Sequence, residues 1–144
     1  MPYIRPIAIC LFLRDGKILV SEEHDPNKGE TFYRPLGGGI EFGEHSIDTI
    51  QRELMEEIGA EVKDLAYLGT LENIFTFNGE PGHEIVQVYD GALVESGLYE
   101  QTMISGHEAD VNQPMKVIWK SLDDFGPDKL ILYPAGLLEM LDQR

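Results

Sequence analysis

Four charged residues near the middle of the chain have the types and the spacing for metal chemistry. Arg52 and Glu53 are followed by Glu56 and Glu57, and this group comes shortly after the glycine run at 37–39. At 3.6 residues per helical turn, the three glutamates stand on one face of a helix as an i, i+3, i+4 set. Carboxylates that share a face repel one another unless a cation lies among them. Hard divalent cations with oxygen ligands, Mg²⁺ first, are the natural candidates.

The same segment resembles the signature of a known enzyme family. From Gly38 to Gly59 it reads GGIEFGEHSIDTIQRELMEEIG. This pattern is similar to the Nudix box of the Nudix hydrolases, G-x5-E-x7-R-E-U-x-E-E-x-G-U, in which U is a bulky aliphatic residue. Leu54 fills the first aliphatic position, whereas Ala60 is smaller than the residue usual at the second. Every fixed position is filled, by Gly38, Glu44, Arg52, Glu53, Glu56, Glu57 and Gly59.

An acidic amphipathic helix is more often a solvated surface element than a metal site. Aliphatic residues at helical spacing predict a buried stripe here, with the acids lying off it. The stripe consists of Ile47, Ile50, Leu54 and Ile58. The glycines before the helix, and Gly59 after it as a left-handed terminator, favour the metal-site interpretation.

The resemblance implies that water attacks one phosphorus of a nucleoside diphosphate linked to another moiety, X. Negative charge in that transition state is spread over several oxygens, so catalysis depends on positioning and charge neutralisation. Mg²⁺ or Mn²⁺ serves both needs. Carried over position by position, the resemblance assigns direct metal binding to Glu53 and Glu57. Glu56 would be a further ligand or act through water, and the Gly37 carbonyl could complete the shell.

Two residues of the box have supporting tasks. The resemblance assigns Arg52 to orienting the glutamates. Arg52 stands i to i+4 from Glu56 and could hold one carboxylate bidentately, the alternative being an ordinary surface ion pair. We expect Glu44 to help at the metal site from the start of the helix. Its structural alternative is pairing with the positive end of the helix dipole.

The general base is open between several carboxylates. Glu53 serves in some members of the family, and others use an acid from a downstream loop. That loop offers Glu100, Glu108 and Asp110. We select Glu108, which shortly precedes the last predicted strand. The His83-Glu84 pair before another strand is a further candidate.

Substrate contacts are expected from outside the box. We choose Arg34, which is close to the glycines and suited to phosphate, together with Tyr33 and Phe75, whose rings could stack on a base. Each keeps a structural alternative, since aromatic residues in strands are more often part of a core. Further candidates of the same kinds are Lys28, Phe77, Tyr89 and Trp119. Before the glycines, Leu36 separates them from Pro35, whereas many relatives place proline directly against them.

Turn residues and apolar spacing predict the elements that position these side chains. Strands are expected at 4–13, 17–22, 31–36, 39–42, 62–77, 85–93 and 115–119, and helices at about 45–58 and 134–141, the latter with Pro134 as its first residue. Residues 96–113 are typical of a mobile loop. Strands on both sides of a central helix indicate an α+β fold with a mixed sheet between helices. The resemblance implies the α/β/α sandwich of the Nudix fold, with the box as a loop-helix-loop.

Length and charge limit the partners. The 144 residues suit a single domain, 1–144, and carry 26 acids against 11 bases, for a net charge of −15. Such acidity disfavours nucleic-acid polymers, which need a basic footprint. A small nucleotide diphosphate derivative remains a candidate substrate, with bound metal screening the repulsion between its phosphates and the acidic protein. A homodimer is left open.

The compartment is suggested by the only cysteine. Cys10 excludes an internal disulfide and fits a reducing cytoplasm. The longest apolar stretch, 7–13, is too short to span a bilayer, and no small-residue cleavage site follows it. We therefore expect a cytoplasmic protein without a membrane partner.

Two other functions are weighed against the hydrolase. Isopentenyl diphosphate isomerases share the fold and a version of the box, but they require a catalytic cysteine, and Cys10 lies in a predicted strand. A non-catalytic nucleotide-sensing or partner-binding domain would also keep the fold. Such domains usually lose box carboxylates, and all of them are present here.

Overall fold

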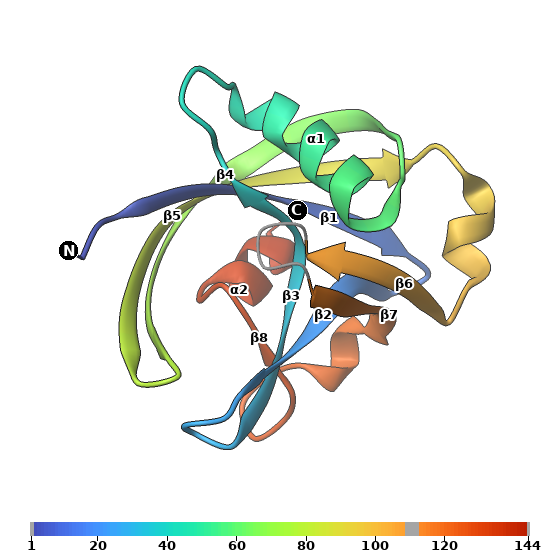
Figure 1. Cartoon of the computed structure of the whole chain (residues 1–144). Coiled ribbons are helices and arrows are strands. Elements are labelled where there is room, and N and C mark those ends of the chain that lie inside the picture. Colours follow the sequence, from blue (N-terminus) through green and yellow to red (C-terminus); the bar gives the residue numbers. More distant parts are fainter. Residues whose placement is uncertain (1, 109–112, 144) are drawn as a thin grey trace.

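The computed structural model describes residues 2–108 and 113–143 (Figure 1). Within these residues the strands are β1 (Arg5–Arg14), β2 (Lys17–Asp25), β3 (Glu30–Gly39), β4 (Val62–Phe77), β5 (Glu80–Leu93), β6 (Met103–Glu108), β7 (Gln113–Ser121) and β8 (Ile131–Leu132). The helices are α1 (Ser46–Ile58) and α2 (Leu137–Asp142), with short 3-10 turns η1 (Ser96–Glu100) and η2 (Leu122–Asp124). No helix in this part of the chain is long and apolar enough to cross a membrane.

The strands form a mixed sheet in the order β4-β5-β1-β3-β2-β7-β6, and β8 pairs with β3. At its centre, β1 runs parallel to β5 and antiparallel to β3. The hairpins β2–β3 and β4–β5 extend from the central strands toward the same end of the molecule (Figure 1). The mixed sheet confirms the predicted α+β class.

Strand β1 separates two hydrophobic cores, because successive side chains of a strand point to opposite faces. The residues that face α1 are Ala8, Cys10 and Phe12, which join the core of Ile50 and Leu54. The residues that face α2 are Ile7, Ile9 and Leu11, which join the core of Leu137. The two helices therefore cover opposite faces of the sheet, as the predicted sandwich requires.

Helix α1 begins and ends as its sequence predicts. It starts after His45, and Gly59 closes it in the left-handed conformation with φ of 65°. The Gly59 N–H donates to the Met55 carbonyl, the 5→1 bond of an αL terminator, and the Ala60 N–H donates to the Leu54 carbonyl. This terminator turns the chain into β4.

The predicted buried stripe of α1 is only partly correct. Ile50 and Leu54 are fully buried, but Ile47 is 38% exposed. Glu53 and Glu57, which were expected off the stripe, are 6% and 4% exposed. The reason is that α1 packs against β3 as well as β1, so its acidic edge lies over the glycine end of β3.

Three element predictions are wrong. Residues 39–42 form no strand of their own, because β3 continues to Gly39 and a turn follows at 42–43. Most of the predicted mobile loop at 96–113 is ordered as η1 and β6, since β6 pairs with β7 as an edge strand. Helix α2 begins at Leu137 rather than Pro134, after Gly136 in a left-handed conformation.

Candidate active site

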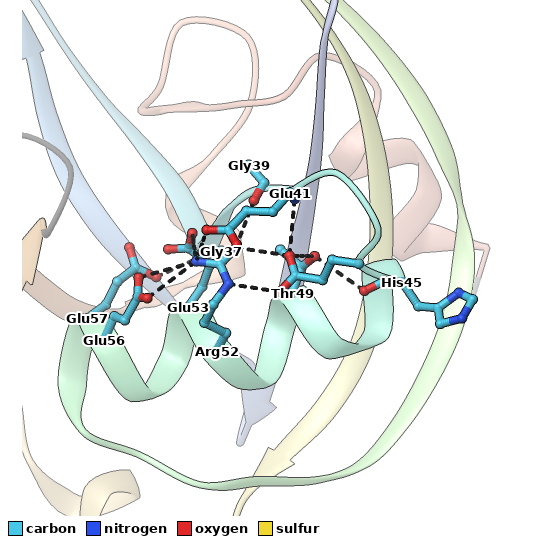
Figure 2. A network of polar contacts seen from close by, with 10 residues as sticks. Gly37, Gly39, Glu41, His45, Thr49, Arg52, Glu53, Glu56 and Glu57 are labelled. Carbon is cyan, nitrogen blue, oxygen red and sulfur yellow. Dashed lines mark hydrogen bonds and ion pairs between the residues drawn. The ribbon is translucent and has the colours of Figure 1, made fainter.

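Arg52 of α1 connects three separate parts of the site (Figure 2). Its Nε and Nη2 donate to the two carboxylate oxygens of Glu44 at 2.8 and 3.0 Å. Nη2 also donates to the Gly39 carbonyl at 2.9 Å, where β3 ends. Nη1 donates to Glu53 at 3.0 Å and, more weakly, to Glu56 at 3.3 Å. Arg52 therefore joins the loop before α1, the end of β3 and two acids of the helix.

The bidentate partner of Arg52 is Glu44, and not the predicted Glu56. The Thr49 hydroxyl donates to the same carboxylate at 2.7 Å. Hydrogen bonds from Arg52 first, and then from Thr49, lower the pKa of Glu44 to about 2. Glu44 is not among the residues that line the cavity described below. Its geometry is that of an anchor for Arg52.

Glu53 and Glu57 lie against the glycines of β3. The Gly37 N–H donates to Glu57 Oε1 at 3.2 Å. A Cβ atom on Gly38 would overlap the carboxylate of Glu53. In the observed side-chain arrangement, therefore, only glycine fits at this position. Burial, and then the negative charges of Glu53 and Glu108, raise the pKa of Glu57 to about 9. The close approach of α1 to β3 thus buries a group of acids that repel one another.

A cavity of about 490 Å³ opens beside these acids. Residues of both extended hairpins, β2–β3 and β4–β5, line it together with residues of α1, β1, β6 and β7, so the cavity lies between the hairpins. Its acidic part contains Arg34, Gly37, Gly38, Glu57 and Glu108. Arg34 is a cation near Glu57, and its charge opposes the rise in the pKa of Glu57. A phosphate group in this part of the cavity would meet both a cation and the box acids.

Several residues chosen from the sequence line this cavity, and several do not. Those that line it are Lys28, Arg34, Gly37, Glu57, Phe75, Phe77 and Glu108. Arg52, Glu44, Glu53 and Glu56 are not among the lining residues, and the Glu56 side chain is exposed. Asp110 lies outside the described residues. Glu100 lies in η1 and lines a smaller, second cavity.

The prediction that Tyr33 contacts substrate is wrong. Its side chain is only 5% exposed and belongs to the core beneath α2. The ring packs edge-on against Phe125 at 5.9 Å, and the hydroxyl donates to Glu22 at 2.9 Å. Neighbouring residues of a strand face opposite ways, so Arg34 lines the cavity and Tyr33 does not. Tyr89 and Trp119 also lie outside it, packed in and against the core beneath α1.

Sequence reasoning missed Asp25, which holds the two hairpins together. Its Oδ1 accepts backbone N–H groups from Asn27, Lys28 and Asn78 at 2.9, 3.3 and 3.1 Å. Burial favours the neutral acid, but these donors outweigh it and hold the pKa of Asp25 below its ordinary value. The Asp-Pro-Asn turn at 25–27 was visible in the sequence, but its contact with Asn78 was not.

The donor set fits a hard divalent cation. Within residues 2–108 and 113–143, no three His, Cys, Asp or Glu side chains are arranged as a ready-made metal centre. Glu53 and Glu56 instead accept hydrogen bonds from Arg52. The buried Glu57 nevertheless feels the charges of Glu53 and Glu108, and a cation among these oxygens would relieve the repulsion.

Comparison with known proteins identifies the family. A model of the NUDIX domain matches residues 3–140. The chain belongs to the Nudix hydrolase family. The Nudix resemblance of the box is therefore confirmed over nearly the whole chain, and with it the assignment as a hydrolase. Nudix hydrolases generally use divalent metal ions and act on nucleotide derivatives.

The curated relatives are longer than this Nudix chain. The NAD-capped RNA hydrolase NudC of Haemophilus influenzae (strain Rd) is 30% identical over 140 residues, which cover 95% of this chain and 46% of that protein. NudC of Actinobacillus succinogenes is 38% identical over 72 residues, or 48% of this chain and 27% of that protein. The chain spans less than half the length of these relatives. Because they are named for an RNA, the exclusion of nucleic-acid polymers stays a prediction.

Solved structures confirm the Nudix fold. The MutT NUDIX hydrolase of Burkholderia pseudomallei superposes with a TM-score of 0.67 at 22% identity, over 98% of both chains. A NUDIX hydrolase of Nitrosomonas europaea also gives 0.67, at 17% identity, over 97% of this chain and 87% of that one.

Proposed function

We propose that this protein is a metal-dependent pyrophosphohydrolase that cleaves the diphosphate linkage of a nucleoside diphosphate joined to a moiety X. The observation that carries the proposal is the buried Glu57, beside Glu53 and Glu108 and opposite Arg34, at the edge of a cavity. The products would be a nucleoside monophosphate and phosphate-X, or pyrophosphate where the substrate is a triphosphate.

In this proposal Glu53 and Glu57 hold the metal directly, with Glu56 and the Gly37 carbonyl as further ligands. Bound Mg²⁺ or Mn²⁺ would neutralise charge that develops on the phosphate oxygens. Hydrogen bonds from Arg52 orient Glu53 and Glu56 before the metal arrives. Arg52 is in turn held by Glu44, so both act as positioning residues.

Glu108 is the carboxylate that we propose as general base. It lies at the end of β6 and lines the same part of the cavity as Glu57. Its role is to accept the proton of the attacking water, while Arg34 binds a phosphate oxygen and Phe75 contacts the remainder of the substrate. Glu100 provides the matched comparison, because it also lies beyond β5 but lines a different cavity.

The test measures phosphate and pyrophosphate release from nucleoside triphosphates, oxidised guanine nucleotides, ADP-ribose, nucleotide sugars, dinucleoside polyphosphates and NAD. Each substrate is assayed with Mg²⁺, with Mn²⁺ and with a chelator. Turnover should require metal, disappear in Glu57→Gln, fall strongly in Glu108→Gln and persist in Glu100→Gln. Full activity of folded Glu57→Gln would overturn the metal-site assignment. If the folded chain turns over no member of the panel, the sensing-domain alternative becomes the better interpretation.

The isomerase alternative is disfavoured by the position of Cys10. The thiol is fully buried in the core beneath α1 and does not line the cavity. Burial, and then the charge of Asp90, raise the pKa of Cys10 well above its ordinary value. A thiol in this state is a poor nucleophile. The single-domain organisation over 1–144 and the cytoplasmic location stay predictions.

A further inference from the structure

The cavity has a second part, away from the box acids, with an aromatic wall. On β4, Asn73, Phe75 and Phe77 line the cavity, and so does Thr76 between the two rings. Ile74 does not line it and is 75% exposed. Phe75 lies opposite Gly82 of β5. A Cβ atom at Gly82 would overlap carbon atoms of the Phe75 ring, so the ring lies directly over the glycine backbone.

Aromatic side chains of other elements complete this wall. The Phe32 ring of β3 meets Phe77 edge-on at a centroid distance of 6.0 Å. It also meets Tyr133 edge-on at 5.2 Å. All of these side chains line the cavity. Rings held in this way offer faces and edges against which a planar heterocycle can pack.

The polar group beside these rings is a buried amide and carboxylate pair. The Ala135 N–H donates to Asn73 Oδ1 at 3.3 Å, which fixes the orientation of the amide. Asn73 Nδ2 then donates to Glu84 Oε1 at 3.4 Å. Arg5 lies 3.8 Å from the other oxygen of Glu84, whose residue is only 4% exposed. A carboxylate has about four acceptor sites, so Glu84 keeps unused acceptor capacity, and Asn73 keeps one amide hydrogen.

We propose that this pair selects a heterocycle whose edge presents an acceptor, a ring N–H and an exocyclic amine in that order, as in guanine. The inference rests on the proposed function and names the base of its substrate. Asn73 would donate to the ring carbonyl, and the two oxygens of Glu84 would accept from the ring N–H and the amine. Glu84 is then the specificity-determining residue.

The order of donors and acceptors excludes the other common bases. Hypoxanthine keeps the carbonyl and the ring N–H but lacks the amine. Uracil places a second carbonyl where the amine should be, and adenine and cytosine present a ring acceptor to the carboxylate. A buried acceptor left without a donor costs free energy, so a mismatched base loses a hydrogen bond and also pays this desolvation cost. Pterins present the same hydrogen-bonding edge as guanine, so they are the second class of ligand that this pair would recognise.

The experiment measures binding of GMP, IMP and AMP to the full chain by calorimetry in the presence of a chelator. No hydrolysis takes place under these conditions, so the result is independent of the metal-site assignment. GMP should bind roughly tenfold or more tightly than IMP, and AMP more weakly than IMP. Neopterin as a competitor distinguishes guanine nucleotides from pterins. Displacement of GMP shows that the hydrogen-bonding edge alone is recognised. Failure to displace GMP shows that ribose phosphate is also needed.

The variant Glu84→Gln tests the selecting residue. The amide replaces one acceptor by a donor, so the preference for GMP over IMP should shrink to within about twofold. Glu72→Gln is the matched control, because Glu72 lies on β4 next to Asn73 but is exposed and does not line the cavity. Equal binding of GMP and IMP by the wild-type chain would overturn the inference even if Glu84→Gln failed to fold. An unchanged preference in folded Glu84→Gln would do the same, while metal-dependent hydrolysis could still stand.

Discussion

Arg52 and Glu44 are joined by two parallel hydrogen bonds of 2.8 and 3.0 Å across eight residues of sequence. The planar guanidinium matches a carboxylate at both oxygens, whereas a lysine ammonium does not. The pair fixes the loop that enters α1 and leaves Nη1 directed at Glu53. It therefore links the start of the helix to the proposed metal ligands.

We expect Arg52→Lys to lower kcat by about tenfold or more and to destabilise the fold by about 1–3 kcal/mol, because the buried partners lose donors that lysine cannot replace. The measurements are steady-state hydrolysis and chemical unfolding. Arg14→Lys is the control, since Arg14 lies at the far end of β1 and stacks on Tyr99. Unchanged kcat in Arg52→Lys would contradict a positioning role.

The raised pKa of Glu57 predicts a pH dependence of stability in the metal-free protein. Between the ordinary value of 4.5 and about 9, the folded state holds a proton that the unfolded state has released. This contribution to stability is therefore present below about pH 4.5, decreases by up to about 1.4 kcal/mol per pH unit, and is lost above pH 9. Thermal unfolding in chelator should show a fall with pH that is smaller in Glu57→Gln than in the wild type or in the exposed control Glu56→Gln. An equal fall with pH in Glu57→Gln and in the wild type would refute the raised pKa of Glu57.

Added Mg²⁺ should stabilise the protein more at pH 8 than at pH 6. The ion competes with the proton on Glu57, so its apparent affinity rises as the proton leaves. The measurement is the rise in unfolding temperature at a fixed Mg²⁺ concentration, with Ca²⁺ for comparison. Glu57→Gln should remove most of the rise, and a pH-independent rise would place the ion elsewhere.

The lowered pKa of Glu44 predicts the opposite pH dependence of stability at acidic pH. Its pKa is lowered to about 2, so its stabilising effect is present above about pH 4.5 and is lost as the pH falls through 2. Glu44→Gln should flatten this part of the stability curve, as followed by circular dichroism. Glu61→Gln, an exposed acid after α1, should leave it unchanged. Coincident curves for wild type and Glu44→Gln would show that the ion pair with Arg52 does not stabilise the fold.

Gly38→Ala should reduce hydrolysis by more than about tenfold, because the added methyl overlaps the Glu53 carboxylate and moves it. Gly97→Ala is the control. A Cβ atom at Gly97 meets only Glu95, at 4.0 Å. Wild-type activity in Gly38→Ala would mean that Glu53 has another functional position.

Cys10→Ala should keep metal-dependent hydrolysis while costing roughly 1 kcal/mol of stability, since a buried sulfur is removed from the core. Activity is measured on whichever substrate the panel identifies. Loss of activity in a folded variant would revive the isomerase-type chemistry that requires a thiol.

The limits of sequence reasoning are visible at neighbouring residues. Arg34 and Tyr33 were both predicted to contact substrate, but only Arg34 lines the cavity, and Tyr33 belongs to a core. Sequence shows that both lie in a strand, but which face meets the cavity depends on the pairing of β3 with β1 and β2. The partner of Arg52 shows the same limit, because helical spacing indicated Glu56 and the loop before α1 supplied Glu44 instead.

The sequence by itself determined the helix from about 45 to 58, its glycine terminator, the α+β class and the Nudix box, because helical period, turn chemistry and motif spacing are local properties of the chain. Only the tertiary structure decided that Glu53 and Glu57 are buried, that Asp25 reaches Asn78, and that Asn73 and Glu84 share an aromatic part of the cavity. These contacts join segments that meet only when the strands pair in one register. Register is set by the packing of both cores at once, and no single stretch of sequence contains that information.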